Sequence, residues 1–270
     1  MIAARASENH IVRDCDSGAV RGSIRGLGCT RLDSRRRTNI GGVTYKVAEC
    51  RREREAAFRL VYDAYREAGL IPENPQRQRV TEYHLLPTTA VFLAIQEGQP
   101  VFTVSLVPDD TLGVPLDSLY HDEVEAMRAQ GHYPAEVTCL AGRRKLFERR
   151  EQFNIFVNLT GLMFQYARQN LVDRLIVAVH PRHAKFYQHF FGFEVFGELK
   201  SYAAIQGNPA VGCVHDFAKT DVTGYPLRDK VYGVTYASWE LVNQPLSSAE
   251  CSYFGKAAQS AGHELVPMAA

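Results

Sequence analysis

The hydrophobic pattern becomes regular from Val43 onward and predicts strands and amphipathic helices. Residues 43–48 alternate between apolar and polar positions, as in an edge strand. A helix is predicted over about 51–68, because Gly69 and then Pro72 form the usual sequence of a helix end. The apolar face of this helix repeats at helical spacing and consists of Ala57, Leu60, Val61, Ala64, Tyr65 and Ala68.

A hairpin and an insertion are predicted next. The apolar runs 90–95 and 101–107 are separated by a Glu-Gly turn, which makes them an antiparallel hairpin. Residues 108–134 read as an insertion of loops with one helix over 117–130.

The second half of the chain alternates strands with helices. A strand over 135–141 precedes a strongly periodic helix, and a buried strand over 175–179 precedes a helix that Pro181 opens. The tail is predicted to add one or two strands and a helix around 234–244. This order indicates an α/β fold, a mixed central sheet flanked by helices. In such sheets the ligand crevice lies off the carboxyl ends of neighbouring parallel strands, here near 136–142 and 179–183.

Composition narrows the class of protein. The 270 residues are 46% hydrophobic and 23% charged, as in globular proteins, and the net charge of +1 predicts no nucleic-acid partner. No secretory signal or apolar run of membrane-spanning length occurs, so no transmembrane segment is expected. The six cysteines are scattered, without a zinc-ribbon or disulfide-scaffold spacing. We therefore expect a cytoplasmic protein.

Two parts are predicted along the chain. Residues 1–42 carry eight arginines against four acids and no clear periodicity, which predicts a disordered basic leader or, alternatively, an arm that contacts an acidic partner. A single domain is predicted over 43–270, with its core at 43–200, the insertion at 108–134 and an extension at 211–270.

Glu136 is the first candidate for chemistry, because it is a carboxylate inside an otherwise apolar strand. Strand alternation places Glu136, Thr138 and Leu140 on one face, with Val137 and Cys139 on the other. A strand-borne acid that faces a crevice can accept a proton from an attacking amine. The alternative is a structural acid paired with a buried arginine.

Cationic and aromatic side chains are further candidates. Arg59 and Tyr62 lie beside the core face of the first helix and are predicted to look into a pocket. A local basic run is either a solvated face or a site for an anionic phosphopantetheine arm or an acidic protein; it contains Arg143, Arg144, Lys145, Arg149 and Arg150.

No metal site is expected. The spacing of His180, His183 and His189 matches no zinc motif, and the chain has no P-loop, Gly-x-Ser-x-Gly or Gly-x-Gly-x-x-Gly sequence. Cys139 lies in an apolar strand, which favours packing over nucleophilic chemistry.

The segment His180–Tyr187, followed by Gly192-Phe193, resembles the final-helix signature of the Gcn5-related N-acyltransferases. The pyrophosphate loop of that superfamily is absent, and Gly142–Leu146 stands in its place. The run Gly98–Pro108 and the Glu136–Cys139 segment resemble motifs of acyl-homoserine-lactone synthases, in which Ser105 and Cys139 replace two arginines. The remaining pattern, including Arg54–Ile71 and Leu86–Thr89, resembles the long-chain N-acyl amino acid synthases of the N-acyltyrosine synthase type. This resemblance covers roughly 43–200.

The resemblance implies the acyltransferase fold and transfer of a fatty acyl group from acyl carrier protein to the α-amine of an amino acid, with tyrosine suggested as acceptor. It implies Glu136 as the base and Tyr187 as the acid for the leaving thiolate, although a packed aromatic fits Tyr187 equally well. It also implies an oxyanion site at the backbone of 139–141. Substrate contacts are implied for Arg59, Tyr62, Ser105, Thr138, Cys139 and Leu140.

Acyl carrier protein is the implied partner and supplies the phosphopantetheine thioester as co-substrate, with no bound cofactor. Its docking is assigned to Arg143, Arg144 and Lys145. The walls of an acyl channel are assigned to Phe92, Phe102, Phe156 and Phe164, which core packing explains equally well. The alternatives are a coenzyme A-dependent N-acetyltransferase, an acyl-homoserine-lactone synthase, and a catalytically silent module that binds acyl chains or a carrier protein.

Overall fold

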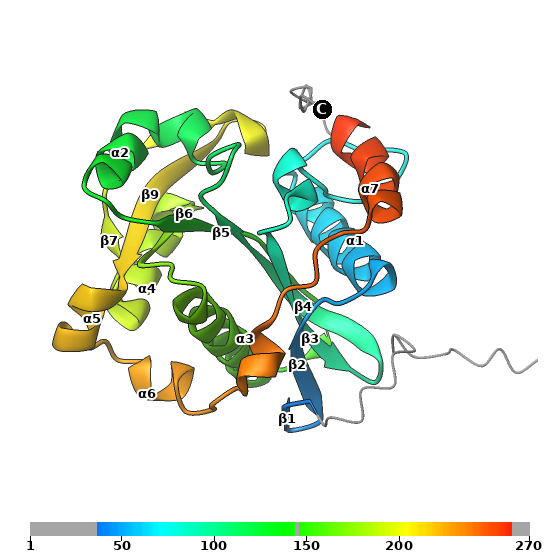
Figure 1. Ribbon diagram of the computed structural model, residues 1–270, viewed down its shortest axis with the longest axis horizontal. Helices are drawn as coiled ribbons and strands as arrows, with labels where there is room; N and C mark the ends of the chain where they lie inside the picture. The colour runs from blue at the N-terminus through cyan, green and yellow to red at the C-terminus, as the bar shows by residue number, and fades with distance from the viewer. Residues whose placement is uncertain (1–36, 144–145, 261–270) are drawn as a thin grey trace, which may run out of the picture.

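The structure is a computed structural model and describes residues 37–143 and 146–260 (Figure 1). Its strands form one mixed sheet with the order β1-β2-β3-β4-β5-β6-β9-β7, and β8 pairs with the start of β9. The strands are β1 (Asn39–Ile40), β2 (Val43–Val47), β3 (Ala90–Gln96), β4 (Gln99–Pro108), β5 (Pro134–Gly142), β6 (Arg174–Val179), β7 (Glu194–Val195), β8 (Lys200–Tyr202) and β9 (Asn208–Asp216).

Helices cover both faces of the sheet (Figure 1). They are α1 (Arg51–Glu67), α2 (Asp117–Ala129), α3 (Arg149–Gln169), α4 (Pro181–Phe191), α5 (Phe217–Thr223), α6 (Arg228–Val231) and α7 (Ser248–Ser260), with 3-10 helices η1 (Glu82–Leu85), η3 (Ala203–Ile205) and η4 (Ser238–Leu241). The side chains of α3 and α4 pack on one face in the largest core cluster. The opposite face carries α1, α7 and α2.

Local sequence signals account for most of these elements. Glu97 and Gly98 both adopt positive φ angles, of 49° and 72°, as the two-residue turn between β3 and β4 requires. Pro181 opens α4, and Gly192 ends it in the left-handed conformation at φ 69°. The predicted mixed sheet with flanking helices is therefore confirmed.

The predicted helix around 234–244 is wrong. Only the short η4 forms there, because the Glu240 carboxylate accepts hydrogen bonds from the backbone N–H groups of Thr38 and Ala237 and Pro245 follows closely. The last helix is α7, which begins where Ser247 and Glu250 cap each other and then buries an apolar face against α1.

The predicted boundary between leader and domain, at residue 42, falls within a hairpin of the sheet. β1 pairs with β2, so the residues from Asn39 onward already belong to the sheet. The other residues of the predicted leader, 1–36, lie outside the described residues. Over 37–143 and 146–260, no helix is both long and apolar enough to cross a membrane.

Strands β5 and β6 run side by side for part of their length and then separate. They form the parallel pair of the sheet, and their register ends at Glu136 opposite Ile176. Beyond this point β6 continues beside β9, while β5 stays paired with β4. Two parallel strands therefore separate at Glu136 and open a space between them.

Candidate active site

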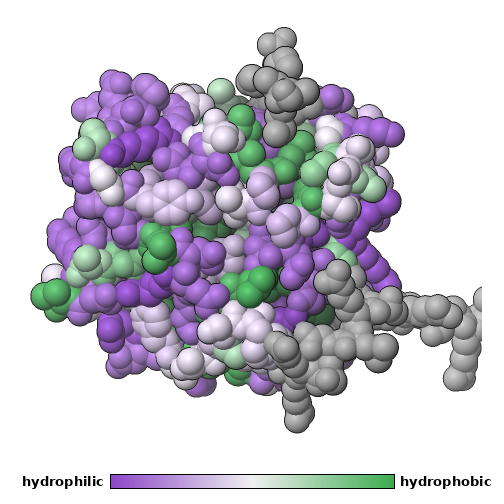
Figure 2. All heavy atoms as spheres, in the orientation of Figure 1, coloured by the Kyte–Doolittle hydropathy of each residue, from purple (hydrophilic) through white to green (hydrophobic). Residues whose placement is uncertain are grey.

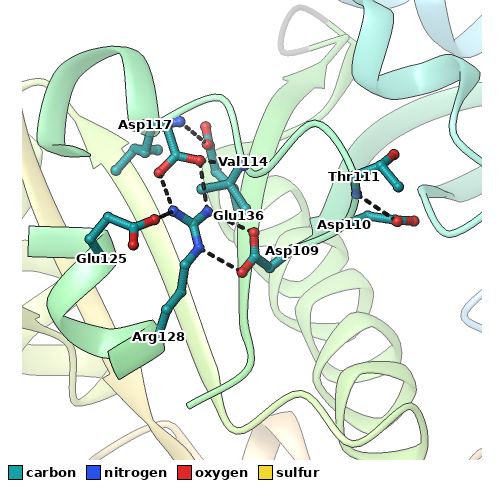
Figure 3. Close-up of polar contacts among 9 residues, drawn as sticks. Asp109, Asp110, Thr111, Val114, Asp117, Glu125, Arg128 and Glu136 are labelled. Carbon is teal, nitrogen blue, oxygen red and sulfur yellow. Dashed lines mark hydrogen bonds and ion pairs between the residues drawn. The ribbon is translucent and has the colours of Figure 1, made fainter. Parts of the chain in front are cut away.

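Glu136 lies at the point where β5 and β6 separate, and its side chain is almost fully buried at 3% exposure. Oε2 accepts a hydrogen bond of 2.6 Å from the backbone N–H of Leu116 (Figure 3). Burial raises the pKa of the Glu136 carboxyl well above its usual range; the Leu116 N–H opposes this shift and the charge of Asp117 adds to it. Among the described residues, Oε1 has no hydrogen-bond donor, so this oxygen is available to a substrate.

The turn that carries Leu116 is held by Arg128, at the end of α2. Its guanidinium donates to Asp109, after β4, at 2.6 and 2.7 Å, and to Asp117, at the start of α2, at 2.7 and 2.8 Å (Figure 3). Asp117 also accepts from the N–H of Val114 at 2.8 Å. These contacts tie both ends of the insertion to β4, and so position the N–H that binds Glu136.

A β-bulge in β5 changes the faces that strand alternation predicts. Cys139 has φ 53°, and the β4–β5 register shifts between Thr103 and Ser105. As a result Cys139 packs against Leu60 and Val61 of α1. Leu140 lies with Val137 on the opposite face, so the predicted grouping of Leu140 with Glu136 is wrong. Burial raises the pKa of the Cys139 thiol, as expected for a packed rather than a reactive cysteine.

Ser105 and Thr138 lie directly opposite each other on β4 and β5, on the face that also carries Glu136. The Ser105 hydroxyl contacts Nε2 of the buried His84 at 3.2 Å. Nδ1 of that ring accepts the N–H of Thr81 at 3.1 Å, so the proton of the neutral ring sits on Nε2 and points to Ser105. Burial, with a smaller contribution from the charge of Arg79, lowers the pKa of His84 to about 3, so the ring stays neutral at physiological pH.

An apolar cavity occupies the opposite side of the separated strands, under α3 and α4. The space between its lining atoms, open solvent included, amounts to about 420 Å³. Of the four phenylalanines predicted as channel walls, Phe156 and Phe164 line it, whereas Phe92 and Phe102 lie elsewhere in the core. The other lining residues are Val104, Val137, Leu140, Leu159, Thr160, Met163, Val177, Tyr187, Phe191 and Phe193.

Tyr187 of α4 lies at this cavity. Its ring lines the cavity and packs edge-on against Phe193, with ring centroids 5.6 Å apart. The side chain therefore packs as an aromatic residue, and its role as the acid for the leaving thiolate stays a prediction.

Two predicted residues of α1 lie away from Glu136. Arg59 is exposed on the outer side of the helix, where it donates to Glu55 at 2.6 Å. Tyr62 is buried, and its hydroxyl accepts the N–H of Asn74 at 3.3 Å, which anchors the segment after α1.

The predicted carrier-docking residues fall at the end of β5. Arg143 is exposed and its N–H donates to the carbonyl of Val101 at 2.8 Å. Arg144 and Lys145 lie outside the described residues. The described ranges contain no group of three or more His, Cys, Asp or Glu side chains that could hold a metal ion.

Three residues of the polar face were not predicted from the sequence: Arg79, His84 and Tyr202. They come from a loop, a 3-10 helix and a short strand that have no strong periodicity. The sequence signals in this region are the turn-forming residues around Pro75 and the isolated His84, and neither predicts a functional site.

The mixed sheet, whose parallel strands β5 and β6 separate at Glu136 between two layers of helices, has the architecture of the Gcn5-related N-acyltransferase fold. A solved structure supports this fold: FeeM, an N-acyl amino acid synthase from uncultured soil microbes, is 24% identical, with 68% of this chain and 96% of that chain covered and a TM-score of 0.59.

The family itself is shown by a sequence model. The model of the family "N-acyl amino acid synthase FeeM" matches residues 56–216, more than half of the chain. The chain belongs to this family of N-acyltransferases.

Other solved structures are less similar. The acyl-homoserine lactone synthase BjaI, described as coenzyme A-dependent, is 16% identical, with 75% and 90% coverage and a TM-score of 0.49. An acyl-CoA N-acyltransferase from Pseudomonas aeruginosa is 13% identical, with 64% and 99% coverage and a TM-score of 0.44. No curated protein sequence matches the chain significantly.

Proposed function

We propose that this protein transfers a long-chain fatty acyl group from acyl carrier protein to the α-amine of an amino acid. The observation that carries the proposal is the position of Glu136, a buried acid with one open oxygen, on the opposite face of the separated strands from an apolar cavity. A neutral amine on the polar face and a fatty thioester from the apolar face would then meet where the strands separate.

In this reaction the amine nitrogen attacks the thioester carbonyl, the N–C bond forms and the C–S bond breaks. Glu136 accepts the proton that the amine loses, and its raised pKa makes it a stronger base than an ordinary glutamate. The leaving thiolate takes a proton, for which Tyr187 at the cavity is the proposed donor. The products are the N-acyl amino acid and the carrier thiol.

The bulge supports an oxyanion site at the backbone of β5. The registers of β4 and β6 pair no residue with Cys139 or Leu140, so the N–H groups of this stretch are candidates to stabilise the thioester oxygen in the transition state. Thr138, just before the bulge, is half-buried and is proposed to contact the acceptor or the pantetheine amide.

The capped start of α3 favours a carrier protein over coenzyme A as donor. The Glu148 side chain caps the helix and accepts a backbone N–H of the first turn, and Glu151 accepts the N–H of Glu148 at 3.2 Å. A diphosphate at this helix end would therefore find fewer free N–H groups. The exposed Arg143 beside it suits an acidic carrier protein, which the enzyme would meet in the cytoplasm.

The test is a comparison of donors with the purified full-length chain. Palmitoyl-acyl carrier protein and palmitoyl-coenzyme A are each supplied with an equimolar mixture of the protein amino acids, and amide products are identified by mass spectrometry. We expect amides of a fatty acid and an amino acid, formed faster from the carrier protein. Arg143→Glu should slow only the reaction with the carrier protein. Lys219→Glu, which reverses an exposed charge on α5, should slow neither reaction. A faster reaction from palmitoyl-coenzyme A would assign the donor to coenzyme A, equal rates would refute the preference for a carrier protein, and no amide from either donor would refute the proposal.

A further inference from the structure

Arg79, in the segment between α1 and η1, is a buried cation without an acidic partner. It is 8% exposed, and its backbone N–H donates to the carbonyl of Phe58 at 3.0 Å. Among the residues that the structure describes, no carboxylate forms an ion pair with it. Its side chain makes one long contact, 3.4 Å from Nη2 to the carbonyl of Ala204, and its Nε is buried without any partner.

A buried arginine without an acidic partner is energetically unfavourable in a protein that has no ligand bound. A charged group that leaves water is costly unless it is paired, and buried arginines are almost always paired. A guanidinium also presents its donors as a rigid fork that matches a carboxylate. The open Nε of Arg79 and its weakly bonded Nη2 therefore point to an anionic ligand that supplies the missing acceptors.

Arg79 and Glu136 border the same region on the α1 side of β5. His84, five residues after Arg79, contacts the Ser105 hydroxyl at 3.2 Å, and Ser105 pairs with Thr138, two residues after Glu136. Loss of solvent is the main cause of the raised pKa values of the half-buried Tyr202 and the buried Cys139, and both groups also feel the charges of Glu136 and Arg79. Tyr202 directly precedes the turn whose Ala204 carbonyl contacts Arg79. No ion pair joins Arg79 to Glu136, so the acid and the cation face this region separately.

We propose that Arg79 binds the α-carboxylate of the acceptor amino acid while Glu136 faces its α-amine. An α-amino acid carries both groups on one carbon, and thus matches a cation and an acid that face one region without pairing. This inference rests on the proposed function and deepens it, because it makes a free carboxylate a requirement for the acceptor. Arg79 is then a substrate-binding residue that selects amino acids over simple amines.

The experiment compares acceptors with and without the carboxylate. The full-length chain and palmitoyl-acyl carrier protein are incubated with the amino-acid mixture or with the matching mixture of decarboxylated amines. For the preferred amino acid, Arg79→Gln should raise KM by about 10- to 100-fold, as expected for the loss of a charge-assisted hydrogen bond. The kcat/KM of the corresponding amine should stay unchanged. Arg79→Lys keeps the charge but not the planar guanidinium, so its KM for the amino acid should lie between those of the wild type and Arg79→Gln. Arg77→Gln is the matched control, because Arg77 lies in the same segment with 74% of its side chain exposed.

Melting temperature separates binding from a structural role. Removing an unpaired buried charge should leave the melting temperature of Arg79→Gln unchanged or higher, whereas removing a structural arginine would lower it. An unchanged KM for the amino acid, or an equal loss of activity on amino acid and amine, would overturn the inference.

Calorimetry of amino-acid binding without the acyl donor distinguishes the two proposals. Binding that requires Arg79, in a protein that forms no amide, would refute the proposed function and leave the carboxylate site standing. Amide formation by Arg79→Gln with the wild-type KM would refute the carboxylate site and leave the proposed function standing.

Discussion

Replacing Glu136 by glutamine tests the proposed base with little change in shape. The exchange turns one carboxylate oxygen into an amide nitrogen, and the remaining oxygen can still accept the Leu116 N–H that now lies 2.6 Å from Oε2. What is lost is the ability to take a proton from the acceptor amine. The packing around the buried side chain is retained.

The expected effects on rate and on stability have opposite signs. Loss of a general base lowers the rate by about 10²- to 10⁴-fold, or about 2.7–5.4 kcal/mol of transition-state stabilisation. The pKa of Glu136 is raised in the folded protein, so burial favours the protonated form. Wild-type stability is therefore lost as pH rises above the unfolded value of about 4.3 toward the folded pKa. A glutamine side chain does not ionise, so the variant does not lose stability with rising pH in this way and should be at least as stable as wild type at neutral pH.

The assay is single-turnover amide formation across a series of pH values, together with melting temperature. The wild-type rate should rise as Glu136 loses its proton, at a pH above that of an ordinary glutamate, and this limb should be absent in the variant. Glu194→Gln, the same exchange at an exposed ion pair on β7, should behave as wild type. A Glu136→Gln protein that turns over within about threefold of wild type, or that keeps the same acidic limb, would show that Glu136 is not the base.

Three further changes test the surrounding structure. Arg128→Gln should lower stability by about 1–2 kcal/mol, because Asp109 and Asp117 lose their charged partner; an unchanged urea midpoint would show that this network does not hold the insertion. Val177 lines the apolar cavity, so Val177→Phe should shift acyl preference to shorter chains, with kcat/KM falling about fourfold for each methylene that no longer fits. The same chain-length profile as wild type would place the acyl group outside this cavity. Gly161→Ala should destabilise by about 1–3 kcal/mol, since a Cβ there would lie 2.3 Å from the carbonyl oxygen of Val231, and a melting temperature equal to wild type would contradict this.

Several elements follow from sequence signals that lie within or next to the element itself. The hairpin of β3 and β4, the bounds of α1 and the start of α4 each follow from residues within one or two turns of the element. Glu136 was likewise recognisable, because a carboxylate in an apolar strand stands out within a few residues. The tail was less readable, since η4 and α7 depend on side-chain caps and on packing against distant helices.

Sequence patterns alone were sufficient to predict the succession of elements from Val43 to about residue 200, the mixed sheet flanked by helices, and the acid within the strand at 135–141. Only the tertiary structure decided which face each residue of β5 occupies. The bulge at Cys139 arises from how β5 pairs with β4, and it moved Leu140 to the apolar cavity. Folding of the chain also places Arg79, from a loop, and Tyr202, from a short strand, on the same side of β5 as Glu136. Hydrophobic periodicity reports on neighbours along the chain, whereas Arg79 and Tyr202 are each more than fifty residues from Glu136 in the sequence. Their interactions arise only once the sheet has formed.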